Sequence, residues 1–168
     1  LALTKTANDY NSPVRIVDTV VEVNAARKKA MADKVIQAMG GDVKGKTIGV
    51  LGLAFKQNTD DMRDAPSLDI IPALQAAGAT IRAFDPEAME EAAHLLSDIE
   101  FAKNAYDAVQ DADAMVIVTE WDQFRALDLD RIKDALNSNI VVDLRNIYSP
   151  EDMAGRGFQY TSIGRPTI

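Results

Sequence analysis

The chain has 168 residues, of which 47% are hydrophobic and 26% charged, enough for one sizeable buried core. Its formal net charge of −8 disfavours nucleic acid as a partner, and no apolar run reaches the ~20 residues that a membrane helix needs. The lack of cysteine excludes disulfides, thiolate metal sites and a cysteine nucleophile within the chain and fits a cytoplasmic protein, while a single histidine argues against a metal cluster.

The first 41 residues predict helices. After a short helical start, Ser12-Pro13 has the form of a cap and first turn for a second helix that runs to Gly40-Gly41. An apolar stripe on this helix is formed by Val17, Val20, Val21, Met31 and Val35, with Asn24 lying within it. Two interpretations stay open: a core helix of one domain, and a connecting helix that also packs against a second subunit.

From Lys46 onward, short β-branched runs alternate with helical patterns. Strands are expected at 47–51, 80–84, 100–102, 113–119, 139–144 and 159–162, and helices at 66–77, 87–96 and within 121–136. This alternation predicts an α/β fold, a Rossmann-like parallel sheet with helices on both faces, preceded by the long N-terminal helix. Ligands of such sheets bind at the carboxyl ends of the strands, so the loops there are the candidate site.

The loop after the first predicted strand contains Gly52, Phe55 and Lys56 where a dinucleotide fold has its glycine fingerprint. Phe55 offers a flat apolar face and Lys56 a mobile ammonium, a combination that suits a sugar phosphate. The alternative is that Phe55 plugs the end of the sheet and Lys56 is a solvated surface residue.

Farther along this loop, Arg63 lies among several carboxylates. It is either held by Asp60 or Asp64 as loop structure, or aimed by them at an anion. Arg145 follows the fifth strand directly after Asp143, where it is an anion-binding candidate unless Asp143 pairs with it.

Other polar and aromatic residues near strand ends are more typical of structure. Asp85 ends the second strand, where dinucleotide folds keep a ribose-binding acid, but the following proline and the missing fingerprint favour a turn. Trp121 and Phe124 either cap the core or line a pocket. His94, on a solvated helix face, is assigned no role, and no pair of carboxylates has a spacing that marks a catalytic acid and base.

Five separated motifs resemble the UDP-glucose 6-dehydrogenase family in matching order. They are Gly52-Leu-Ala-Phe-Lys56, Thr59-Asp-Asp-Met-Arg-Asp-Ala-Pro-Ser67, Phe84-Asp-Pro86, Val118-Thr-Glu-Trp121 and Asp143-Leu-Arg145. The resemblance spans almost the whole chain and implies the C-terminal portion of such an enzyme. Residues 1–41 would be the helical end of the central dimerisation domain, and residues 42–168 the UDP-sugar-binding domain.

The resemblance implies an NAD-dependent, two-step oxidation of the sugar C6 alcohol to a carboxylate through a cysteine-bound thiohemiacetal. It implies that Phe55, Lys56 and Arg145 bind the UDP-sugar and that Arg63 approaches NAD, which is held mainly by an N-terminal domain outside the chain. It also favours a homodimer formed through the long helix.

The chain departs from the family in having no cysteine and no Gly-x-Gly-x-x-Gly fingerprint, so no catalytic residue is assigned and the chain alone is expected to be inactive. A fragment of a complete enzyme is favoured over a noncatalytic nucleotide-sugar-binding module, because the chain starts at Leu1 rather than Met. GDP-mannose and UDP-N-acetylmannosamine dehydrogenases are related alternatives, but Thr119-Glu-Trp121 favours UDP-glucose. A phosphoacceptor receiver domain, with Asp85 or Asp143 as acceptor, is disfavoured because the first strand does not end in an acidic pair.

Overall fold

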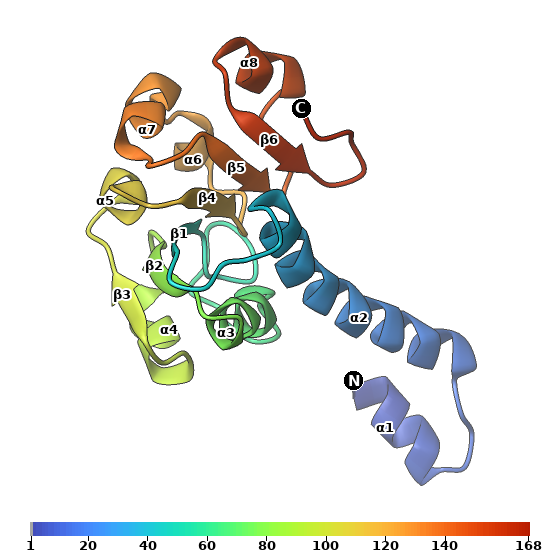
Figure 1. The fold of residues 1–168 in the computed structure, drawn as a ribbon. Helices are drawn as coiled ribbons and strands as arrows, with labels where there is room; N and C mark the ends of the chain where they lie inside the picture. The colour runs from blue at the N-terminus through green and yellow to red at the C-terminus, as the bar shows by residue number, and fades with distance from the viewer. Residues whose placement is uncertain (1) are drawn as a thin grey trace.

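The computed structural model describes residues 2–168, and its centre is a parallel β-sheet (Figure 1). Within these residues, the sheet has six strands in the order β3-β2-β1-β4-β5-β6. The strands are β1 (Thr47–Leu51), β2 (Thr80–Phe84), β3 (Ile99–Phe101), β4 (Ala114–Ile117), β5 (Ile140–Asp143) and β6 (Gln159–Ser162). All neighbouring pairs are parallel, and this is the strand order of the Rossmann fold. The predicted fold class is therefore confirmed.

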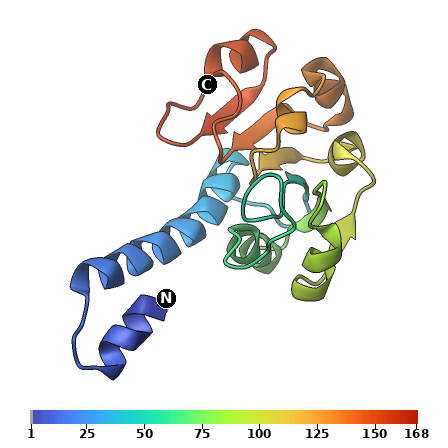
Figure 2. The ribbon, with the colours of Figure 1, turned by 180° about the vertical axis from the view of Figure 1, so that it is seen from behind.

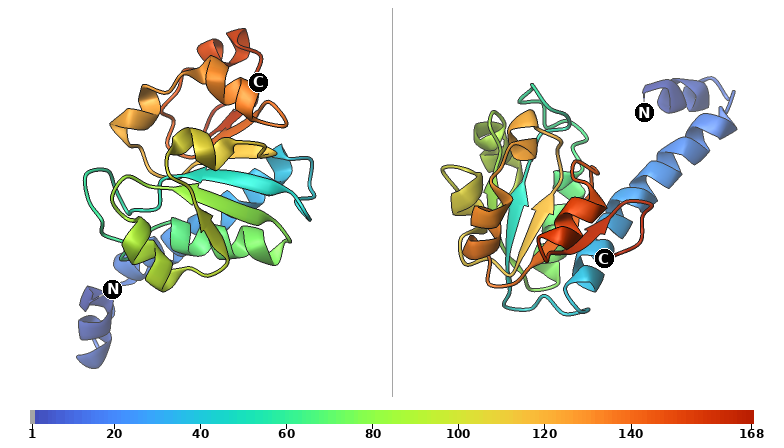
Figure 3. Two further views of the ribbon diagram at one scale, coloured as in Figure 1. Left: turned by 90° about the vertical axis from the view of Figure 1, so that its left-hand side faces the viewer. Right: turned by 90° about the horizontal axis from the view of Figure 1, so that it is seen from above.

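Helices connect the strands and cover both faces of the sheet, as Figure 3 shows from two directions. They are α1 (Ala2–Asp9), α2 (Arg15–Ala38), α3 (Ser67–Ala76), α4 (Met89–Leu95), α5 (Ala105–Val109), α6 (Asp122–Arg125), α7 (Leu129–Ala135) and α8 (Pro150–Gly155). The core lies between these helices and strands that are buried on both sides, such as β4, whose four residues are all buried. Burial on both sides explains why the strands read as continuous apolar runs.

Two short helices, α5 and α8, were not expected from periodicity, because neither is long enough to display a repeat. Each has a local signal at its start. The side chain of Asn104 accepts a hydrogen bond from Asp107 N at the start of α5, and Ser149 caps α8 just before Pro150. Both are standard helix caps, and proline is favoured in the first turn.

The predicted start of the long helix was wrong. The helix α2 begins at Arg15, and Val14 precedes it without any side-chain cap. Ser12 instead belongs to the end of α1, because its backbone N donates to Ala7 O at 2.8 Å, and Asn11 beside it has a positive φ of 51°. The chain therefore turns back between the two helices before α2 starts.

The helix α2 is long, as expected, and its two halves have different surroundings. Ala32 and Val35 near its C-terminal end are buried in the core of the sheet domain. Toward its start, Ile16, Val20 and Val23 are 82%, 52% and 58% exposed. Figures 1 and 2 show this half extending away from the sheet with α1 alongside it. The core-helix interpretation holds only for the second half of α2.

Candidate functional site

A cleft of about 650 Å³ lies between α2 and the carboxyl ends of the strands. We call it the α2 cleft. From the strand side it is lined by Phe55, Val118, Leu144 and Arg145, and from the helix side by Val21, Asn24, Arg27, Lys28 and Met31, among others. The strand order reverses between β1 and β4, where the loops diverge and leave a crevice at the carboxyl edge. The α2 cleft is therefore in the place where this fold binds its ligands.

Gly52 shapes the first turn of this edge. Its φ is 93°, and a Cβ atom built there would lie 2.6 Å from both Thr119 N and Thr119 Cβ. Only glycine allows the loop after β1 to pass this close to Thr119, the second residue after β4. The loop is held again one step farther on, where the Thr119 hydroxyl donates to Ala54 O at 2.6 Å.

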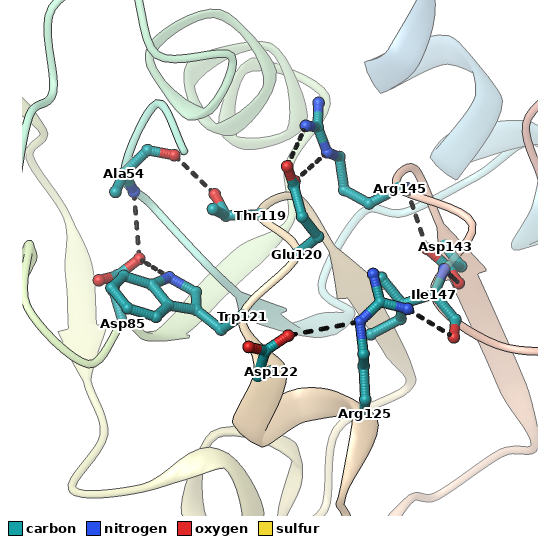
Figure 4. A network of polar contacts seen from close by, with 10 residues as sticks. All are labelled: Ala54, Asp85, Thr119, Glu120, Trp121, Asp122, Arg125, Asp143, Arg145 and Ile147. Atoms are coloured by element: carbon teal, nitrogen blue, oxygen red, sulfur yellow. Dashed lines mark hydrogen bonds and ion pairs between the residues drawn. The ribbon is translucent and has the colours of Figure 1, made fainter. Parts of the chain in front are cut away.

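Asp85 at the end of β2 is fully buried and organises the same loop (Figure 4). Its two oxygens accept five hydrogen bonds of 2.6–3.1 Å, from the backbone N–H groups of Leu53, Ala54, Glu87 and Ala88 and from the indole of Trp121. The carboxylate is thus occupied by protein donors, as expected of a turn residue. It does not have the free oxygens that a ribose-binding acid needs.

Trp121 and Phe124 cap the core and do not line the α2 cleft. Trp121 is 6% exposed and Phe124 is fully buried, where its ring packs edge-on against Phe84 with 6.2 Å between the ring centroids. Burial leaves the indole N–H in need of an acceptor, which Asp85 supplies. Of the two interpretations of these rings, capping is correct.

Arg145 lines the α2 cleft and is held by two carboxylates (Figure 4). Asp143 accepts from its backbone N at 2.9 Å, and Glu120 accepts from both Nε and Nη2 of its side chain, the latter at 2.7 Å. The expected alternative partner of the guanidinium, Asp143, is therefore wrong. Burial raises the pKa of Glu120, but the hydrogen bonds from Arg145 and from its own backbone outweigh this and lower the pKa below its ordinary value.

Asp143 is a second fully buried carboxylate. Besides Arg145 N, its oxygens accept from Ile147 N at 2.7 Å, Tyr148 N at 3.1 Å and the Tyr160 hydroxyl at 2.8 Å. These bonds wrap the loop after β5 around the carboxylate. Burial and, to a smaller extent, the hydrogen bond to Asp143 raise the pKa of Tyr160 far above its ordinary range. The hydroxyl therefore remains a donor.

Phe55 and Lys56 lie side by side in the loop after β1. Phe55 is 47% exposed and lines the α2 cleft, so it does not plug the end of the sheet. Lys56 is exposed and, within residues 2–168, makes no hydrogen bond or ion pair. It is not among the residues that line the cleft, although its neighbour is. Phe55 and Arg145 thus line the same cleft, and Lys56 lies exposed next to Phe55 in the chain.

Arg63 stands apart from these residues. Its side chain is 90% exposed, and its Nε and Nη2 bond both oxygens of Asp61 at 2.9 and 2.7 Å. The expected partners, Asp60 and Asp64, are therefore wrong, because the backbone N–H of Arg63 donates to Asp61 Oδ1 at 2.9 Å and this turn already brings Asp61 and Arg63 together. The side-chain hydrogen bond from Arg63 lowers the pKa of Asp61 to about 2. Arg63 does not line the α2 cleft.

Sequence reasoning missed the cations that α2 contributes to the cleft. Lys28 donates to Asp64 O at 3.0 Å and pairs with Asp69 at 3.2 Å, which ties α2 to α3 and to the loop before it. Arg27, also at the cleft, has no hydrogen bond or ion pair within the described chain. The signal was available: Asn24, Lys28 and Met31 recur at helical spacing and so share one face of α2.

Metal and dinucleotide ligands fit this domain poorly. No group of three or more His, Cys, Asp or Glu side chains in residues 2–168 is arranged to hold a metal ion. The turn after β1 has a single glycine, and Asp85 is occupied by protein donors, so a dinucleotide lacks both of its usual contacts at this edge. In the same part of the chain, no helix is both long and apolar enough to cross a membrane.

Comparisons with known proteins identify the family of the chain. Residues 49–150 match the family model described as "UDP-glucose/GDP-mannose dehydrogenase family, UDP binding domain". The chain is 54% identical over 166 residues to UDP-glucose 6-dehydrogenase of Rhizobium meliloti, and 42% identical over 168 residues to the enzyme TuaD of Bacillus subtilis; 99% of the chain is covered in each case. It spans only 38% and 36% of the lengths of these relatives.

Among solved structures, the UDP-glucose dehydrogenase of Pyrobaculum islandicum aligns with 95% of the chain at a TM-score of 0.76 and 27% identity, and 34% of that protein is covered. The matched residues include Phe55, Lys56, Glu120 and Arg145, and the fold around them agrees with that of a dehydrogenase. The chain therefore belongs to the UDP-glucose/GDP-mannose dehydrogenase family, within which it contains the UDP binding domain.

Proposed function

We propose that the chain is the UDP-sugar-binding C-terminal part of an NAD-dependent UDP-glucose 6-dehydrogenase, which oxidises UDP-glucose to UDP-glucuronate. The observation that carries the proposal is the α2 cleft, whose strand side combines an exposed aromatic ring, Phe55, with a held guanidinium, Arg145. The ring offers a packing surface for an apolar face of the ligand, and the guanidinium a fork for phosphate oxygens. The 54% identity to an enzyme of that name favours UDP-glucose among nucleotide sugars.

Lys56 completes the proposed substrate site. Its side chain is exposed and makes no hydrogen bond or ion pair within the described residues, and its charge acts on Asp61 only at longer range, so it can turn toward a ligand without first breaking a direct contact. The overall charge of the chain is negative, and a phosphate therefore depends on individually placed cations such as Lys56 and Arg145.

The chemical step and the main NAD contacts belong to residues outside this chain. The chain has no cysteine for a thiohemiacetal, and its first turn does not fit a dinucleotide. Arg63 is the one residue that we assign to NAD: it is 90% exposed, outside the α2 cleft, and available to a cofactor held by another domain. We accordingly divide the chain into residues 1–41, the end of a central domain, and residues 42–168, the UDP-sugar domain.

We also propose that the projecting half of α2 takes part in a homodimer. Ile16, Val20 and Val23 lie on this half of α2 and are between 52% and 82% exposed. Large apolar side chains on one projecting helix are costly to leave in water and are typical of a helix that packs against a partner. Sedimentation of the wild type as a dimer and of Val20→Asp as a monomer would support this, with Lys29→Asp as the exposed control. A wild-type monomer would contradict it.

The activity is tested in the intact protein, by which we mean the product of the complete reading frame containing these 168 residues. NADH formation is measured with UDP-glucose, GDP-mannose and UDP-N-acetylmannosamine in turn. We expect UDP-glucose to be oxidised with two NAD+ reduced per sugar, because an alcohol becomes a carboxylate. Preference for another sugar would assign a different substrate within the family, and no reduction with any of them would leave a binding module.

The substrate site is tested by single substitutions in the same protein. Lys56→Ala and Arg145→Ala should each raise the KM for UDP-glucose about tenfold or more, since each removes a charged partner of a phosphate. The matched controls are Lys103→Ala, an exposed lysine elsewhere, and Arg156→Ala, whose side chain is 36% exposed and ion-paired like that of Arg145. An unchanged KM and kcat for Lys56→Ala would remove Lys56 from the site.

A further inference from the structure

The guanidinium of Arg145 is held more firmly than a surface arginine. Asp143, which is fully buried, fixes the backbone of Arg145 through a 2.9 Å hydrogen bond. Glu120 then holds the end of the side chain by accepting from Nε and Nη2. The Glu120 and Arg145 side chains are 24% and 36% exposed, so water competes less for this ion pair than for a fully exposed one.

The sheet brings these two residues together from distant parts of the sequence. The strands β4 and β5 are neighbours, with Ile117 opposite Asp143 in register. Glu120 lies three residues after Ile117, and Arg145 lies two residues after Asp143. Both side chains therefore emerge at the same edge of the sheet. The Glu120 side chain is not among those that line the α2 cleft, whereas that of Arg145 is.

The paired geometry leaves one edge of the guanidinium available. A guanidinium has five N–H donors, and Glu120 takes two of them, which leaves three. In Figure 4 the remaining terminal nitrogen of Arg145 points away from Glu120. The edge formed by the two terminal nitrogens can still donate in parallel to two oxygens of one anion.

We propose that Glu120 is a positioning residue: it fixes the Arg145 side chain so that the free edge of its guanidinium is presented to a phosphate of the ligand in the α2 cleft. This inference rests on the proposed role of Arg145 in binding the UDP-sugar. Without Glu120 the Arg145 side chain would have to be ordered by the ligand itself, at a cost in side-chain entropy. If Glu120 instead competed with the ligand for Arg145, removing its carboxylate would lower the KM for the nucleotide sugar rather than raise it.

The test is a double-mutant cycle in the intact protein with UDP-glucose as the varied substrate. Glu120→Gln should raise the KM about three- to tenfold and leave kcat within about twofold, because the amide carbonyl can accept only one of the two bonds. Arg145→Ala should have the larger effect. In the double variant, Glu120→Gln should add nothing to Arg145→Ala, because a positioning residue has no function without the residue that it positions.

Each other result overturns the inference in a different way. A lower KM for Glu120→Gln would mean that Glu120 competes with the ligand, and full additivity would mean that it acts independently of Arg145. An unchanged KM for Glu120→Gln beside a raised KM for Arg145→Ala would overturn the positioning role and leave the proposed site intact. An unchanged KM for Arg145→Ala would overturn the binding role itself.

A second measurement separates positioning from a general loss of structure. In the NMR spectrum of the wild type, the Arg145 Nε–H signal should be resolved and slow to exchange, and Glu120→Gln should speed its exchange. The matched control is Glu100→Gln, which removes the carboxylate that pairs with Arg82 at 3.1 Å. That variant should leave both the Arg145 signal and the KM unchanged, and a rise in KM there would indicate a nonspecific effect of losing a carboxylate.

Discussion

At the carboxyl ends of β2 and β5, Asp85 and Asp143 are fully buried and accept hydrogen bonds mainly from backbone N–H groups. In the neighbouring loops, the carboxylates of Asp61 and Glu120 are partly exposed and pair with arginines. The buried carboxylates define where the loops run, whether or not a ligand is bound. The exposed ones act on side chains that a ligand can reach. Substitutions of the buried carboxylates should therefore affect folding, and substitutions in the exposed ion pairs should affect the residues that a ligand can reach.

The largest effect on folding is expected for Asp85→Ala. Five donors lose their acceptor, and an unsatisfied buried donor costs about 1–3 kcal/mol, so the free energy of unfolding should fall by about 3 kcal/mol or more. Urea unfolding followed by circular dichroism measures this. Asp33→Ala, an exposed carboxylate toward the C-terminal end of α2, should stay within about 0.5 kcal/mol of the wild type. Equal losses for both variants would contradict a special role for the buried carboxylate.

A smaller loss is expected for Gly52→Ala, which tests the contact between the loops after β1 and β4. Its new Cβ atom would meet Thr119 at 2.6 Å, whereas Gly41 has a similar φ of 90° and open space around it. Gly41→Ala therefore reports backbone strain alone. Gly52→Ala should destabilise the protein by about 1–3 kcal/mol beyond that, the usual cost of overpacking. If both variants unfold at the same urea concentration, the close contact does not matter for stability.

The smallest effect on stability is expected for Arg63→Ala, which removes the exposed ion pair with Asp61. The folded pKa of Asp61 is lowered from 3.8 to about 2, so the ion pair stabilises the protein above pH 3.8 and is lost as the pH falls through about 2. Both side chains are solvated, and the urea midpoint at neutral pH should not change measurably. NMR titration of the Asp61 carboxyl carbon should show its pKa returning toward 3.8. A pKa that stays near 2 in the variant would mean that Arg63 is not its cause.

The sheet could be predicted from the sequence because each strand is a local pattern. The run at β1 is apolar over consecutive residues, and Gly52 marks its end. The loop residues Phe55, Lys56 and Arg145 could be named because a parallel sheet gathers its carboxyl ends at one edge. These inferences need only neighbours in sequence and one rule of topology.

The partners of the charged residues could not be predicted in this way. Glu120 is 25 positions from Arg145, and only the pairing of β4 with β5 brings them together. The helical wall of the α2 cleft depends on how α2 crosses the sheet, which its periodicity does not specify. The helical spacing of Asn24, Lys28 and Met31 shows that they share one face of α2, but only the folded chain shows that this face lines the cleft and that Lys28 pairs with Asp69.

The hydrogen bond between Trp121 and Asp85 has a practical consequence. Trp121 is the single tryptophan of the chain, and its indole shares one carboxylate oxygen with the backbone of Leu53 and Ala54, two residues before Lys56. Movement of that loop changes the polarity around one emitting ring, and no other indole within the chain contributes background. The protein thus carries an intrinsic fluorescent reporter at the root of the loop that we assign to the nucleotide sugar.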